Sequence, residues 1–396
     1  MEIEVDVTEE NPDLDSFEQM EDGSIAFGEP TPPAEDTDFY ANLADIMPDS
    51  DLNSLKNDLM SNIESDKDSR GDWEKTYREG LEYLGMKYEE RSQPFEGASG
   101  VMHPLLSESV TQFQAQAYNE LLPSQGPVKT QVLGMTTPET EQQAARVQEF
   151  MNYQLMQVMK EYDPETDQML FYLPLSGSAF RKVYYDQNLG RAVSKFIPSE
   201  DLIVPYSATD LHSATRITHV INMPMNDIRK LQQIGFYKDV DLDSGNMMAD
   251  ETDEIQEEIN ELQGVKPSYD DDDTCKVHEI HTELDIEGFE DMNAEGEDTG
   301  IKLPYIVTIG NNKVLSIRRN YKENDQLKQR INYFVHYKFL PGLGFYGFGL
   351  THMIGGLSKA ATSILRQLID AGTLSNLPAG FKARGIRIRN DDQPLQ

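Results

Sequence analysis

The hydrophobic pattern of this 396-residue chain changes period near Gly177, and this change constrains the fold more than any other feature. Before it, apolar residues recur every three to four positions, as in the series Leu106, Val110, Phe113 and Ala117, which indicates helices. After it come short runs of β-branched and aromatic residues, the first at 180–185, which indicate strands. A run of helices followed by a run of strands predicts an α+β fold with mixed helices and antiparallel sheets.

The same patterns predict individual elements. Trp73, Tyr77 and Leu81 are spaced for one helical face, and Thr137-Pro138 is typical of an N-cap followed by proline at the first helical position. After Pro224, Asn226 is expected to cap a short helix. Strands are expected at 180–185, 192–197, 202–205, 217–222, 276–286, 303–309, 313–318 and 331–339, and a long helix is expected at 350–375.

Charge is distributed unevenly along the chain. It contains 34 Lys and Arg against 70 Asp and Glu, for a net charge of -36, which disfavours a surface that coats nucleic acid. The first 69 residues contain no Lys or Arg before Lys56, so an acidic, disordered N-terminal tail is expected there. A second acidic stretch at about 239–275 is expected to be an insertion with a polar helix. From Ile301 onward the balance reverses to 14 basic against 5 acidic residues.

The sequence lacks the usual signals of an enzyme, a metal site or a membrane protein. The two histidines of His278-Glu279-Ile280-His281 would point to opposite faces of a strand, and the acidic loop at 270–273 lacks the spacing of a calcium site. Cys275 follows a run of acids that would raise its thiol pKa. We therefore predict no catalytic residues, no metal ligands and no cofactor, and no apolar stretch is long enough to span a membrane.

One motif offers an alternative. Gly342-Leu343-Gly344-Phe345-Tyr346-Gly347 matches the G-x-G-x-x-G pattern of a dinucleotide-binding turn between a strand and a helix. The acid that should follow, Asp370, falls within the expected helix instead of at the end of a second parallel strand. A flexible turn is the favoured interpretation, and a nucleotide-binding enzyme is the alternative.

The long helix after this turn has a stripe of apolar positions beside several small residues, which allow close helix packing. The chain provides no obvious helical partner after it, so we expect it to dock against a neighbouring subunit, with packing inside an ordinary domain core as the alternative. The residues expected at the subunit contact are Ile354, Gly355, Gly356, Leu357, Ala361, Ile364 and Leu368.

Several stretches, in order, resemble the portal proteins of tailed bacteriophages, most closely those of short-tailed phages. They are 95–99 (FEGAS) with 103–106 (HPLL), 196–206 (FIPSEDLIVPY), 218–220 (THV) before 226–231 (NDIRKL), and 344–347 (GFYG) running into 368–381 (LIDAGTLSNLPAGF). No single stretch is diagnostic, but their order indicates the family. The resemblance covers most of residues 71–389.

The resemblance implies a structural, non-enzymatic subunit of a ring, expected to contain twelve copies, at one vertex of the capsid. Double-stranded DNA would pass through its channel during packaging and ejection, and terminase, head-to-tail adaptor and capsid proteins would be its partners. The implied location is the virion after assembly in the host cytoplasm. Another virion neck or scaffold protein is a further alternative.

The implied domains are the acidic tail at 1–69, a portal-like wing at 70–340, a glycine-rich turn with a stem helix at 341–380, and the start of a clip at 381–396. Family members continue further, so the chain is expected to be an N-terminal fragment. In a channel that must let DNA slide, a few cations would suffice to centre the duplex. The candidates facing DNA are Lys359, Arg366, Lys382, Arg384, Arg387 and Arg389.

Overall fold

The computed structural model describes residues 39–86, 91–186, 189–242, 254–264, 274–292 and 298–376. The chain divides into two compact units. The described part of the first unit is small. It contains the edge-to-face pair of Phe39 and Tyr40, and a turn after Ile286 followed by a bridge between Met292 and Asp298. The second unit, at 42–283 and 304–396, contains the sheets and the long helix.

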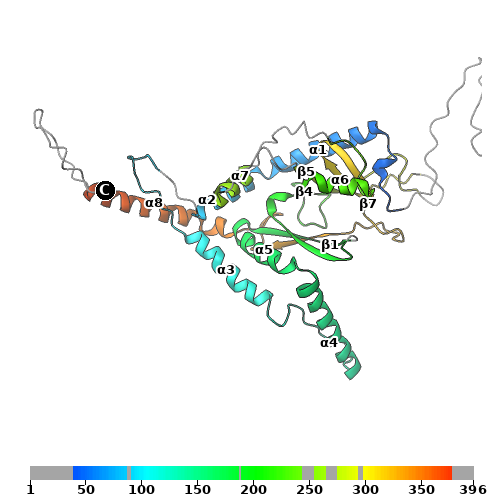
Figure 1. Ribbon diagram of the computed structural model, residues 1–396, viewed down its shortest axis with the longest axis horizontal. Helices are drawn as coiled ribbons and strands as arrows, with labels where there is room; N and C mark the ends of the chain where they lie inside the picture. Colours follow the sequence, from blue (N-terminus) through cyan, green and yellow to red (C-terminus); the bar gives the residue numbers. More distant parts are fainter. Residues whose placement is uncertain are drawn as a thin grey trace, which may run out of the picture. The chain divides into compact units, whose positions relative to one another are not determined.

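The second unit combines helices with two sheets, which confirms the α+β prediction (Figure 1). Its helices are α1 (Asp49–Ser69), α2 (Gly71–Tyr83), α3 (Leu105–Leu121), α4 (Pro138–Tyr153), α5 (Tyr162–Ser176), α6 (Met225–Gln233), α7 (Glu254–Gln263) and α8 (Leu350–Asn376). Short 3-10 helices occupy η2 (Leu43–Asp45) and η4 (Ser199–Asp201), and η3 (Gln154–Val158) is a π-helix.

The strands form sheets of three and five strands. The smaller has the order β2-β1-β8, and both pairs in it are antiparallel. The larger has the order β3-β4-β5-β6-β7, with the β3–β4, β4–β5 and β6–β7 pairs antiparallel. The bounds are β1 (Ser178–Asp186), β2 (Arg191–Ile197), β3 (Leu202–Ile203), β4 (Arg216–Pro224), β5 (Thr274–Leu284), β6 (Leu303–Gly310), β7 (Lys313–Arg319) and β8 (Phe334–Lys338).

Two of the buried clusters connect the sheets and the helices near α8. One joins the two sheets, with Phe180 of β1, Ile217 of β4 and Phe334 of β8 packed together. The other lies among helices α2, α3, α5 and α7, where Tyr77 and Leu106 are almost fully buried, and Ile354 of α8 packs against it. The long helix is therefore attached to the helical cluster through Ile354.

The N-terminal region corrects one expectation, because α1 is a packed helix where the acidic tail was expected to continue to residue 69. Leu52, Leu59 and Ile63 are buried along one side of α1, and Asp66 pairs with Arg216 of β4 at 2.6 Å. The acidic composition concealed this apolar spacing. Residues 1–38 lie outside the described residues, so the rest of the expected tail stays a prediction.

Helix starts agree with the sequence in one case and differ in another. Thr137 caps α4 as predicted, with Thr140 completing a reciprocal capping box and Pro138 at the first helical position. Asn226 does not cap α6, because that helix already begins at Met225 after Pro224. The polar helix expected in the acidic insertion is α7, and its buried residues Ile255 and Ile259 join the helical cluster.

Helix α4 has an unusual attachment. None of its residues is buried, and it extends away from β1 and α5 (Figure 1). Asn152 exchanges two hydrogen bonds with the backbone of Val128, at 2.9 and 3.1 Å, and Gln148 accepts one from the Thr130 amide. Polar side chains therefore hold α4 to the preceding segment, while Phe150 is 60% exposed.

Candidate functional site

Helix α8 has an inverted distribution of polar and apolar residues. Its buried residues are Thr351, Gly355, Ser358, Thr362 and Asp370, whose spacing places them on one face. On the opposite face four large apolar side chains are exposed: Met353 (58%), Leu357 (62%), Ile364 (59%) and Leu368 (67%). We call these four residues the apolar stripe. An ordinary surface helix buries such a stripe, so α8 presents a surface that is suited to a partner.

The residues expected at a subunit contact divide into three groups by exposure. Leu357, Ile364 and Leu368 lie in the exposed apolar stripe, and Gly356 is exposed with open space around it. Ile354 and Ala361 are half-buried. Gly355 departs from the expectation, because it is buried, and a Cβ at this position would lie 3.5 Å from the ring of Tyr83. Gly355 therefore faces its own chain, at a distance that would accommodate a Cβ.

Two of the six candidates for DNA contact lie in the described part of the chain, and both contact other residues of the same chain. The Lys359 ammonium lies 5.8 Å from the centre of the Tyr83 ring, and a hydrogen bond with Tyr83, together with the charges of Glu79 and Glu82, raises its pKa. Arg366 Nε donates to the carbonyl of Val101 at 2.7 Å. The other candidates lie outside the described residues: Lys382, Arg384, Arg387 and Arg389.

Three glycines allow the close packing at the base of α8. Gly177 ends α5 with φ of 83°, and a Cβ on it would lie 2.4 Å from the carbonyl oxygen of Gly347. A Cβ on Gly347 would lie 2.4 Å from the Gly177 oxygen, and one on Gly349 would lie 2.6 Å from the Leu175 oxygen. The backbones of the α5–β1 turn and of the turn before α8 are therefore in direct contact.

Hydrogen bonds reinforce this contact. The hydroxyl of Ser178, at the start of β1, accepts from the Gly347 amide at 2.8 Å and lies 3.1 Å from Nε2 of His336. Thr351, in the first turn of α8, donates to the carbonyl of Leu175 at 3.0 Å. The base of α8 is thus fixed to both α5 and β1.

This geometry argues against the nucleotide-binding alternative. The strand before the glycine-rich turn, β8, is antiparallel to β1, whereas a dinucleotide fold needs parallel strands. Gly342 and Gly347 approach backbone atoms of the protein itself, in the space where a bound pyrophosphate would have to lie. The sequence favoured a flexible turn over a nucleotide site, and the structure shows a turn whose glycines pack closely against the backbone of the chain itself.

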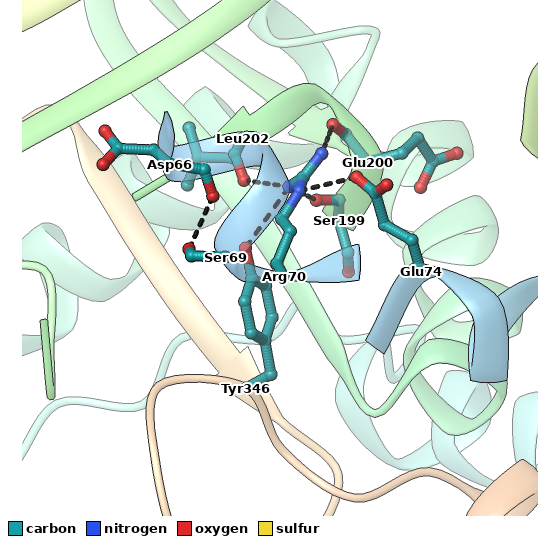
Figure 2. Close-up of polar contacts among 8 residues, drawn as sticks. All are labelled: Asp66, Ser69, Arg70, Glu74, Ser199, Glu200, Leu202 and Tyr346. Atoms are coloured by element: carbon teal, nitrogen blue, oxygen red, sulfur yellow. Dashed lines mark hydrogen bonds and ion pairs between the residues drawn. The ribbon is translucent and has the colours of Figure 1, made fainter. Parts of the chain in front are cut away.

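Arg70, between α1 and α2, connects the turn before α8 to the rest of the unit (Figure 2). Its side chain is almost fully buried and donates to three backbone carbonyls, those of Ser199, Leu202 and Glu200, at 3.1, 2.9 and 2.6 Å. It also donates to Glu74 Oε1 at 2.7 Å and to the Tyr346 hydroxyl at 3.2 Å.

The ring of Tyr346 stacks on Trp73 with ring centres 4.5 Å apart. The turn before α8 is therefore held by α2 as well as by Arg70. Sequence reasoning missed Arg70, because a single arginine between two helices carries no periodic signal.

The remaining chemical candidates are structural. His281 is buried and hydrogen-bonds to Glu279 within β5, which agrees with the expected antiparallel strand. Burial raises the pKa of the Cys275 thiol, and this cause differs from the neighbouring acids that the sequence suggested. Across the described ranges, no group of three or more His, Cys, Asp and Glu side chains is placed to hold a metal ion.

Comparison with known families decides the identity. The family model described as phage SU10 portal protein matches residues 178–386, which is more than half of the chain. The chain belongs to the phage SU10 portal protein family. The region of the chain that matches the portal model begins at β1 and contains every strand of both sheets together with α8.

Membership of the portal family makes the chain a structural component of a phage particle and is consistent with a protein that is not an enzyme. A search of curated proteins finds no match to this portal chain. In the described part of the chain, no helix has both the length and the apolar character needed to cross a membrane.

Proposed function

We propose that this chain is a subunit of a portal ring of the short-tailed-phage type, in which α8 is the stem helix and packs against a neighbouring copy. The observation that carries the proposal is the apolar stripe, in which Leu357, Ile364 and Leu368 are each more than half exposed. Family membership supports a multimer in the phage head.

The energetics favour a partner for this stripe. Full burial of a Leu, Ile or Met side chain contributes roughly 1.5–3 kcal/mol, so the four residues of the apolar stripe represent a substantial driving force for association. A closed ring requires a heterologous interface, in which two different surfaces of each copy meet. The apolar stripe would supply one of these surfaces.

The proposed ring of twelve subunits encloses a channel for the genome at one capsid vertex. Its clip region contacts terminase during packaging and the head-to-tail adaptor proteins afterwards, and the capsid proteins surround it. Assembly takes place in the host cytoplasm. An acidic body suits a conduit, since each phosphate that a cation neutralises adds affinity and would slow sliding.

The basic residues proposed for the channel fall into two groups. Lys359 and Arg366 contact their own subunit, so any contribution to DNA centring comes second to those contacts. The remaining candidates for contact with the passing duplex are Lys382, Arg384, Arg387 and Arg389.

The test places a charge in the apolar stripe. Leu357→Glu and Leu368→Glu should each prevent ring formation, because an unpaired carboxylate would have to be buried at the subunit contact. Gln367→Glu, which adds the same charge at an exposed position beside the stripe, is the matched control and should assemble normally.

Assembly is measured by light scattering coupled to gel filtration and by negative-stain imaging. Closed rings are expected for the wild-type chain and for the control, and monomers for the stripe variants. A wild-type chain that stays monomeric at every concentration, or stripe variants that still form rings, would contradict the proposal.

A further inference from the structure

An extended segment is bound along α8 by side chains of the helix. We call this segment, residues 99–103, the strap. The contacts are three hydrogen bonds: the Ser99 amide donates to Asp370 Oδ1 at 2.7 Å, Arg366 Nε donates to the Val101 carbonyl at 2.7 Å, and the His103 amide donates to Thr362 Oγ1 at 3.0 Å. The strap residues involved are every second residue, and the helix residues are every fourth.

Two residues of the strap and four residues of the helix cover nearly the same distance. Two residues of extended chain advance by about 6.6 Å, and four residues of α-helix advance by about 6 Å. The strap therefore runs antiparallel to α8, and each pair of strap residues covers about one turn. The contacts involve only strap backbone, so their strength is largely independent of the strap side chains.

The order of donors and acceptors on the strap matches the order on α8. Along the strap, the groups that face α8 are an amide, a carbonyl and an amide, and α8 presents an acceptor, a donor and an acceptor. A slip of one helical turn would place the Asp370 carboxylate against the Val101 carbonyl, and Arg366 against an amide. The present register therefore pairs each of these three strap groups with a complementary group on α8.

The strap also continues directly into another helix. Pro104 follows His103, and α3 begins at Leu105. Thr362 and Asp370 are both on the buried face of α8, opposite the apolar stripe. Whatever holds these two residues against the strap also determines the direction in which the stripe points.

We propose that the strap is a positioning device that sets the rotation of α8 about its own axis and so directs the apolar stripe away from the subunit. Thr362, Arg366 and Asp370 are its positioning residues. This inference rests on the proposed function, because it assigns a purpose to the direction of the stripe. It also assigns Arg366 to the strap, in addition to any role near DNA.

The experiment compares two double variants. Thr362→Val with Asp370→Ala removes both acceptors, whereas Thr362→Ser with Asp370→Asn keeps an oxygen acceptor at each position. Thr373→Val is the control, because Thr373 is exposed and its hydroxyl donates to the Ile369 carbonyl in the same helix. Hydrogen exchange of the strap amides is measured at a concentration that keeps the chain monomeric.

A second readout reports the direction of the stripe without assembly. Leu357→Cys is introduced in each background, and the rate at which the introduced thiol reacts with a maleimide is measured. The native Cys275 is buried and serves as the internal reference for an intact fold.

We expect the hydrogen-exchange rate of the strap amides to rise roughly fivefold or more in the acceptor-free variant, since loss of one hydrogen bond raises the exchange rate of its amide by about a factor of five. The reaction of the introduced thiol should slow there, because α8 turns its stripe toward the subunit, and ring formation should decline. The variant that keeps acceptors and the control should behave like the wild type.

Unchanged strap exchange in the acceptor-free variant would overturn the proposal. Faster strap exchange with an unchanged rate of maleimide reaction would also overturn it. The proposal would likewise fail if the acceptor-retaining variant differed from the wild type in strap exchange or in maleimide reaction. A wild-type chain that forms no ring would instead overturn the proposed function alone, because the exchange and labelling readouts do not depend on assembly.

Discussion

The ammonium of Lys182 lies 2.6 Å from both carboxylate oxygens of Glu279, and this ion pair connects the two sheets. Lys182 is on β1 of the three-stranded sheet, and Glu279 is on β5 of the five-stranded sheet. The same carboxylate is 2.7 Å from Nε2 of His281. Burial would raise the pKa of Glu279, but the Lys182 charge and the His281 hydrogen bond outweigh it and hold the pKa well below its ordinary value.

Removal of one partner of this ion pair should destabilise the fold strongly. Glu279→Gln leaves the Lys182 ammonium, whose side chain is only 15% exposed, without a counter-charge. We expect the unfolding free energy to fall by about 3 kcal/mol or more, measured by urea denaturation. Asp227→Asn, which breaks the exposed pair with Lys230, should cost no more than about 0.5 kcal/mol. Equal effects of the two substitutions would contradict the inter-sheet role.

Stability should also decrease with acidification. Burial lowers the pKa of His219 and of His336 from 6.5 to about 3. Between these values the unfolded chain binds a proton at each histidine and the folded chain does not, so the unfolding free energy falls as the pH falls from 6.5 toward 3. Because the pKa of Glu279 is also lowered in the folded chain, the unfolding free energy falls further as the pH falls below about 4.5.

Urea denaturation at several pH values between 7.5 and 4.5 measures this dependence. His336→Gln should make the decline with pH shallower, because one of the histidines that resist protonation is gone. A decline that is as steep in this variant as in the wild type would show that His336 does not contribute.

Arg70 should be difficult to replace. Arg70→Met would leave the carbonyls of Ser199, Glu200 and Leu202 without the donor that now satisfies them. We expect a loss of about 2–4 kcal/mol in unfolding free energy, and Arg70→Lys should recover only part of it, because an ammonium lacks the fork of donors. Arg229→Met, at an exposed position of α6, is the control and should have little effect on the denaturation midpoint.

The glycines at the base of α8 and within it should respond in opposite ways. Gly347→Ala places a methyl group 2.4 Å from a backbone oxygen, so it should destabilise the unit by at least about 1 kcal/mol and displace the start of α8. Gly356→Ala meets open space in the middle of a helix and should stabilise by roughly 0.5–1 kcal/mol. Thermal melts of the two variants test this contrast, and shifts of the same sign would contradict it.

The regular elements of the fold were predictable because each has a local signal. The run of β-branched and aromatic residues from Phe180 onward predicts β1, and Thr137 with Pro138 predicts the start of α4. Helix α1 was missed, since its buried residues Leu52, Leu59 and Ile63 are separated by many acids, and composition dominated the interpretation. How the two sheets pack together depends on long-range contacts such as Lys182 with Glu279, and these carry no local signal.

The candidate site was predictable in part for the same reason. The apolar spacing of α8 identified Leu357, Ile364 and Leu368, and these side chains are exposed. The opposite face was not anticipated, because Thr362 and Asp370 are ordinary polar residues until the strap lies against them.

Helix α4 adds nothing to the buried interior, since its own polar side chains fasten it to the neighbouring backbone. Val147, Phe150 and Met151 are exposed on α4. Substitutions at these positions should therefore leave the unfolding free energy of the isolated chain unchanged. The effect of the same substitutions on infectious particles can then be compared with these folding measurements. If Val147, Phe150 or Met151 proves sensitive there, that position reports a contact with another molecule of the particle.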